Sequence, residues 1–154
     1  KLDTLQAQII DAQIIAGKME DDDLIRDLES ALSYIRKILA SEVKNSPLPE
    51  MQLFSKGMEE LRERSHNPKK YYGIGHLIPS YLMGEITAKL NLLRTSARET
   101  ELAAVSAFLK DGTLEREDIV CALNRLSSGF YVLMLKFVSE KADSGIKEWS
   151  GLWL

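Results

Sequence analysis

Apolar residues recur at intervals of three and four along most of the chain, which is the spacing of amphipathic α-helices. The first two predicted helices cover about residues 2–16 and 24–43. Gly17-Lys18 is expected to end the first helix. Asp21 to Asp23 suit the start of the second helix, and Pro47 ends it because proline has no N–H group to donate.

Three more helices follow. The third is expected over about residues 50–65, with Met51 and Phe54 on its buried face. The fourth runs from about Pro79 to Lys110. Its predicted buried stripe is Leu82, Ile86, Leu90, Leu93, Ala97, Ala104 and Phe108. The fifth follows Thr113 as a cap, with the stripe Ile119, Leu123, Leu126, Phe130, Leu133 and Phe137.

The remaining segments show no helical period. Residues 65–76 are rich in turn formers and are predicted to be an ordered loop, often a functional feature in a compact domain. The tail with Trp149 and Trp153 carries no structural prediction, and no segment has the pattern of a strand. The fold class is therefore all-α, a five-helix bundle that forms one domain over residues 1–154.

Composition narrows the function classes. The chain of 154 residues is 45% hydrophobic and 28% charged, which is typical of a globular protein. Its net charge of −3 argues against broad nucleic-acid binding. The single cysteine, Cys121, is expected to be packed on a helix and excludes a four-thiolate zinc site within one chain. No apolar run approaches the length of a membrane span.

Glu63 and His66 have the Glu-x-x-His spacing found in di-iron bundles. Such sites need a second motif of this kind, and the sequence has none. His66 is therefore interpreted as an exposed residue at a helix end, and no metal site is predicted.

Arg94, Arg98 and Glu101 share one face of the fourth helix. Two like charges one turn apart repel each other, and an anionic ligand such as phosphate would remove that penalty. From spacing alone, two surface arginines paired with acids remain the favoured interpretation. On the fifth helix, Asn124 and Ser128 align with Tyr131 beside other poor helix formers, which indicates either close helix packing or ligand contact.

Two segments together carry a resemblance to a known family. Arg94-Thr95-x-x-Arg98-Glu99-x-Glu101 and Leu123-Asn124-Arg125-Leu126-Ser127-Ser128 resemble the ATP:cob(I)alamin adenosyltransferases. With His76-Leu77-Ile78-Pro79, the sequence is most similar to the EutT type of ethanolamine utilisation, over about residues 74–138. The related PduO-type enzymes share the first two motifs.

The resemblance implies a five-helix bundle that transfers the 5′-deoxyadenosyl group of ATP to Co(I) of a corrinoid and releases triphosphate. It implies ATP and cobalamin as substrates, with Mg²⁺ expected as well, at a site between subunits of a homo-oligomer, a trimer ahead of a dimer. A cytoplasmic location is expected because Co(I) chemistry needs a reducing setting and no export signal is visible, and the resemblance adds an association with a bacterial microcompartment as a further expectation.

The resemblance assigns the catalytic residues Arg94, Arg98 and Asp3. Arg94 matches an arginine that pairs with an aspartate at the start of the first helix, for which Asp3 is the candidate. Arg98 matches an arginine that contacts the ATP phosphates. Glu101 matches an acid that orients or pairs with these arginines at the ATP site.

Five more residues are implied in binding. Asn124 matches an asparagine near the triphosphate, and Arg125 lies beside it in the same motif. His76, Leu77 and Ile78 are the expected corrinoid-binding residues. In PduO-type enzymes a phenylalanine at the histidine position lies against the lower corrin face. The hypothesis here is that His76 and its neighbours keep the cobalt four-coordinate; a loop histidine that merely packs or caps is the alternative.

The chain departs from both enzyme types at its start. The His- and Cys-rich metal motif of EutT-type proteins and the N-terminal ATP loop of PduO-type enzymes are not present, so we expect that a natural N-terminal segment is missing. Two non-catalytic alternatives stay open. One is a helical oligomerisation or scaffold module, and the other is a module that holds the corrinoid without transferring the adenosyl group.

Overall fold

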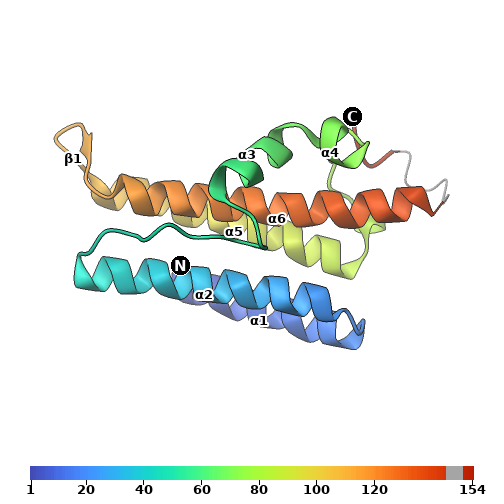
Figure 1. Ribbon diagram of the computed structural model, residues 1–154, viewed down its shortest axis with the longest axis horizontal. Coiled ribbons are helices and arrows are strands. Elements are labelled where there is room, and N and C mark those ends of the chain that lie inside the picture. The colour runs from blue at the N-terminus through green and yellow to red at the C-terminus, as the bar shows by residue number, and fades with distance from the viewer. Residues whose placement is uncertain (145–150) are drawn as a thin grey trace.

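The computed structural model describes residues 1–144 and 151–154, and four long helices dominate it. Helices α1 (Leu2–Lys18) and α2 (Asp22–Lys44) form a hairpin on one side of the bundle, and α5 (Glu85–Phe108) packs against α1. Helix α6 (Glu117–Asp143) packs against α5 and carries the short helices α3 (Met58–His66) and α4 (Pro68–Tyr72) on its other side (Figure 1). The all-α prediction is confirmed.

The chain begins and ends these helices by local chemistry. The Asp21 side chain accepts a hydrogen bond from the Leu24 N–H at 3.0 Å, which caps α2 as predicted. Asn45 ends α2 in the left-handed conformation. Helix α1 ends at Lys18, within the predicted stop at Gly17-Lys18.

The predicted third helix begins too early. Residues 46–57 are not helical, and Leu53 and Lys56 exchange two backbone hydrogen bonds across a tight turn in which Phe54 has a positive φ. Met51 and Phe54 are buried as expected, but from this non-helical segment rather than from a helix face. The spacing of three residues between them fits a helix and a turn equally well.

Helix α4 and the start of α5 also differ from expectation. The predicted loop contains α4 because Pro68 occupies its first turn, where a missing N–H costs nothing. A 3-10 turn (η1, Tyr81–Met83) and Gly84 with φ of 88° precede α5. Leu82 lies in this turn and is exposed, not buried.

A hairpin joins α5 to α6, where the sequence predicted a helix end and a Thr113 cap. Strands β1 (Leu109–Lys110) and β2 (Thr113–Leu114) are antiparallel. Asp111 and Gly112 both have positive φ in the two-residue turn, a strong hairpin signal that the helical interpretation passed over. Arg116, not Thr113, stands at the start of α6.

Helix α6 forms the centre of the core. The whole predicted stripe from Ile119 to Phe137 is buried. Helix α6 is long and apolar enough to cross a membrane, but 56% of its most apolar stretch is buried inside the protein. Buried core helices commonly have this length and composition.

Gly129 of α6 lies against the 53–54 turn. A Cβ added there would come within 2.7 Å of Leu53 Cδ2 and 2.8 Å of Phe54 Cε2, and both side chains are buried. The close-packing interpretation of this glycine is therefore supported. Gly17 of α1 has no neighbour within 4 Å of such a Cβ.

We expect Gly129→Ala to lower the free energy of unfolding by about 1–2 kcal/mol, because overpacking outweighs the helix propensity gained. Gly17→Ala is the matched control and should raise it by up to about 1 kcal/mol. Thermal and urea unfolding measure both. Equal effects of the two changes would contradict the packing argument.

The start of α6 is tied to the end of α2 by an ion pair. Arg116 donates to both carboxylate oxygens of Asp118 at 3.0 Å and to the Ser46 carbonyl at 3.0 Å, and Asp118 accepts from the Leu48 N–H. The hydrogen bond from Arg116 is the main cause that lowers the pKa of Asp118 to about 2.

Because this pKa is depressed on folding, the stabilisation is complete above the ordinary aspartate range and is lost as pH falls from about 4 towards 2. We expect Asp118→Asn to cost roughly 1 kcal/mol at pH 7, after allowance for solvent screening, and progressively less in acid. Urea unfolding at several pH values measures this. A cost independent of pH between 7 and 2 would contradict the assignment.

Candidate active site

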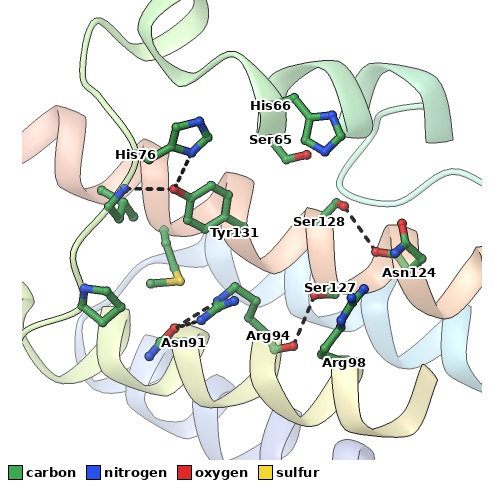
Figure 2. Close-up of a pocket in the computed structure, with 13 residues that line it drawn as sticks. Ser65, His66, His76, Asn91, Arg94, Arg98, Asn124, Ser127, Ser128 and Tyr131 are labelled. Carbon is green, nitrogen blue, oxygen red and sulfur yellow. Dashed lines mark hydrogen bonds between the residues drawn. The ribbon is translucent and has the colours of Figure 1, made fainter. Parts of the chain in front are cut away.

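A cavity of about 510 Å³ opens between α5, α6, the end of α3 and the segment before η1 (Figure 2). Polar side chains from α5 and α6 line one part of it: Asn91, Arg94, Arg98, Asn124, Ser127 and Ser128. His76, Leu77, Pro79, Tyr131 and Met134 line the other part. One end is therefore rich in donors, and the other is largely apolar.

Arg94 and Arg98 lie one helical turn apart on α5 and both reach the cavity. Arg94 donates from Nε and Nη2 to Asn91 Oδ1 at 3.0 and 2.9 Å and has no carboxylate partner among the described residues. Arg98 donates to Glu101 Oε2 at 3.0 Å, and its side chain is 56% exposed. Both guanidinium groups keep donors available to an anion.

Glu101 does not line the cavity but lies behind it, 9% exposed. Its second oxygen accepts a hydrogen bond from Asn124 Nδ2 at 3.1 Å. This carboxylate therefore joins Arg98 of α5 to Asn124 of α6 and fixes both. The predicted orienting role agrees with this geometry, whereas direct contact with a ligand does not follow from it.

Arg125 also lies outside the cavity wall. It donates to Asn124 Oδ1 at 2.8 Å and lies 3.7 Å from the exposed Glu59 carboxylate. Its Nε is buried without a hydrogen-bond partner among the described residues. The structure thus places Arg125 as a support of Asn124.

The segment that carries His76 is anchored on two sides. The Leu77 N–H donates to the Tyr131 hydroxyl at 2.9 Å. The Ile78 N–H donates to the Leu152 carbonyl at 2.7 Å, and the Leu154 N–H donates to the His76 carbonyl at 2.8 Å.

The same contacts explain why residue 75 is a glycine and where Trp153 of the C-terminal tail lies. A Cβ on Gly75 would overlap the Leu154 carbonyl, so the close approach requires glycine. Trp153 forms the bridge opposite Leu77. Trp149 lies outside the described residues.

The three residues expected to bind corrinoid do not behave alike. His76 and Leu77 line the cavity, whereas Ile78 does not and is 43% exposed. Asp3 lies at another place, in a second cavity of about 420 Å³ lined by residues of α1, α2, α5 and α6. Within one chain the structure therefore does not bring Asp3 to Arg94.

Helix α3 contributes cavity residues that were not predicted from the sequence. Ser65 and His66 line the wall that faces the α6 serines, so both histidines of the chain border one cavity (Figure 2). His66 is exposed, as predicted, but its position on the wall depends on how α3 packs across α6. Asn91, three residues before Arg94, was detectable as a possible helix-face partner.

No group of three metal-ligating side chains occurs among residues 1–144 and 151–154. Cys121 is exposed, so the prediction that it is packed is wrong.

Residues 1–137 match the family model of cobalamin adenosyltransferases. The chain belongs to this family. Among curated relatives of the chain, the corrinoid adenosyltransferase EutT of Salmonella typhimurium is 38% identical over 109 residues, covering 70% of this chain and 41% of the relative. EutT of Escherichia coli K12 is 36% identical over 118 residues, covering 76% and 43%. The predicted family is confirmed.

The chain thus spans about two fifths of the length of these relatives. No solved structure matches it.

We expect Glu101→Ala to lower the free energy of unfolding by about 1–3 kcal/mol, since it leaves Asn124 and Arg98 without their shared acceptor. Glu99→Ala, on the exposed face of the same helix, should change it by less than about 0.5 kcal/mol. Urea unfolding of both variants measures the difference. Equal costs would show that the buried carboxylate has no special structural role.

Proposed function

We propose that this chain transfers the 5′-deoxyadenosyl group of ATP to the Co(I) centre of a corrinoid. The observation that carries the proposal is the single cavity in which Arg94, Arg98 and Asn124 lie opposite His76 and Leu77. Family membership and the EutT relatives support the same reaction. The electron pair of Co(I) forms the bond to C5′, the C5′–O bond breaks, and triphosphate leaves with the bonding electrons.

The donor-rich end suits the triphosphate. Charge accumulates on the leaving group as the C5′–O bond breaks, and fixed donors aimed at that charge lower the barrier. Arg98 is held by Glu101 and Arg94 by Asn91, so both guanidinium groups are oriented before a ligand arrives. Asn124 is oriented by two partners, Glu101 and Arg125.

The apolar end suits the corrin. Leu77, Pro79 and Met134 offer an apolar wall next to the His76 ring. A wall without a free ligand for cobalt would leave the metal four-coordinate and make its reduction easier. Ile78 lies on the exposed rim, where we assign it a contact only with the edge of the ring system.

The expected pairing of Asp3 with Arg94 requires a second copy of the chain. Arg94 has no acid partner among the described residues of its own chain, and Asp3 is far along the bundle in another cavity. We infer a homo-oligomer, with a trimer ahead of a dimer, in which Asp3 of one copy meets Arg94 of the next. Exposed apolar side chains on α1 and directly after it support an interface there: Ile10, Ile14 and Met19.

Mg²⁺ enters this scheme with ATP. The described residues offer no cluster of three carboxylates or histidines, and Glu101 is already engaged by Arg98 and Asn124. Mg²⁺ commonly keeps several water ligands and binds through substrate phosphates. We therefore assign its ligands to the triphosphate of ATP and to water. We place the reaction in the cytoplasm, because Co(I) needs reducing surroundings.

Arg98→Ala is expected to abolish most ATP-dependent consumption of chemically reduced cobalamin under argon, with at least a tenfold loss of kcat/KM. Removal of one positioned charge contact from a transition state is worth about 2–4 kcal/mol. Loss of the Co(I) absorbance and formation of adenosylcobalamin measure it. The control is Arg36→Ala, an exposed arginine of α2 remote from the cavity, which should retain full activity.

Binding of ATP and of Co(II) corrinoid is measured on the same samples. Corrinoid binding without ATP consumption would favour a corrinoid-holding module. Binding of neither substrate would overturn the proposal in favour of a helical scaffold. Full activity of Arg98→Ala would remove the phosphate role from this arginine.

A further inference from the structure

Tyr131 is the one hydroxyl that joins α6 to the His76 segment among the described contacts. Its oxygen lies 2.9 Å from the Leu77 backbone nitrogen and 3.3 Å from His76 Nδ1. The two rings are stacked, with an angle of 12° and centroids 6.3 Å apart (Figure 2). Phenylalanine at this position would retain the ring contact and lose both hydrogen bonds.

We propose that Tyr131 is a positioning residue that sets both the place and the tautomer of His76. This inference rests on the proposed function, because it concerns how the corrin end of that site is held. The hydroxyl oxygen accepts the Leu77 N–H, so the hydroxyl proton remains to be donated. Among the described residues, His76 Nδ1 is the acceptor within reach.

The direction of that hydrogen bond decides what His76 offers to a ligand. A neutral imidazole has one N–H and one lone pair. If Nδ1 accepts from Tyr131, then Nε2 carries the proton and has no lone pair for a metal. His76 can then lie against a corrin without becoming an axial ligand of its cobalt. The opposite tautomer would leave Nε2 free to coordinate.

The backbone contacts explain why one hydroxyl can matter. The segment from Gly75 to Ile78 belongs to no helix, and among the described residues Tyr131 and two hydrogen bonds to Leu152 and Leu154 hold it. Those two bonds fix the backbone on one side only. Tyr131 supplies the anchor on the side of α6, which carries Asn124 two turns earlier. The hydroxyl thus sets the distance between the two ends of the cavity.

The first test needs no substrate. Long-range ¹H–¹⁵N spectra at alkaline pH report the tautomer of each neutral histidine, and the chain has only two. His66→Gln removes one set of signals and so assigns the other to His76. We expect the Nε2–H tautomer in the unsubstituted protein. The Nδ1–H tautomer would overturn the proposal.

The second test uses Tyr131→Phe, with Tyr81→Phe as the matched control because Tyr81 is 87% exposed and lies outside the cavity. We expect Tyr131→Phe to raise KM for the corrinoid about fivefold, the worth of a hydrogen bond of about 1 kcal/mol, with KM for ATP unchanged. In the presence of ATP, Co(II) cobinamide bound to this variant should show nitrogen splitting in its electron paramagnetic resonance spectrum, because Nε2 becomes free to coordinate. The unsubstituted protein and Tyr81→Phe should show none.

An unchanged KM for corrinoid and no nitrogen splitting in Tyr131→Phe would overturn the positioning role while leaving the adenosyltransferase reaction standing. If the unsubstituted protein neither binds nor converts corrinoid, the proposed function fails, and the role of Tyr131 towards corrinoid fails with it. A thermal unfolding curve for each variant separates these outcomes from a loss of fold.

Discussion

Glu101 places a carboxylate in the seam between α5 and α6, and the arrangement of the cavity depends on how that charge is satisfied. A buried carboxylate is costly unless its oxygens accept hydrogen bonds. Here one oxygen accepts from Arg98 on its own helix and the other from Asn124 on the facing helix. A rotation of either helix would break one of these bonds, so the charge fixes the angular register in which both helices present their polar side chains.

The apolar seam alone would not fix that register as sharply. Leucine and phenylalanine side chains in a helix pair can shift by a rotamer and still bury similar area. A hydrogen-bonded charge has no comparable alternative in a dry environment. The core therefore supplies most of the cohesion between α5 and α6, whereas the Arg98–Glu101–Asn124 bridge supplies the specificity of their alignment.

The helical class and the α6 stripe could be predicted because both depend on local periodicity. Failures occurred where a few backbone angles decide the path. The predicted fourth helix ran through Gly84, although the positive φ of that residue interrupts it, and Asp111 and Gly112 were interpreted as a helix end although their positive φ values form a hairpin turn. Likewise Met51 and Phe54 matched a helical face but are buried from the non-helical segment before α3.

For the site, motifs on single helices identified Arg94, Arg98 and Asn124, which share a wall of one cavity. Residues that reach the cavity through tertiary packing were not predictable in this way. His66 depends on the crossing of α3 over α6, and the distinction between Arg98 at the surface and Glu101 behind it depends on burial. Sequence spacing gives the face of a helix but not what covers it.

The cavity draws its wall from residues between Ser65 and Met134, and neither α1 nor α2 contributes a side chain to it. The N-terminal hairpin instead buttresses α5 from behind. A bound ligand should therefore protect backbone amides from hydrogen exchange most strongly in α3, α5 and α6, because these elements contact it and share its free energy of binding. The inward faces of α1 and α2 hold the wall in place, whereas α1 also carries Asp3 and the exposed Ile10 and Ile14, which the proposed oligomer uses.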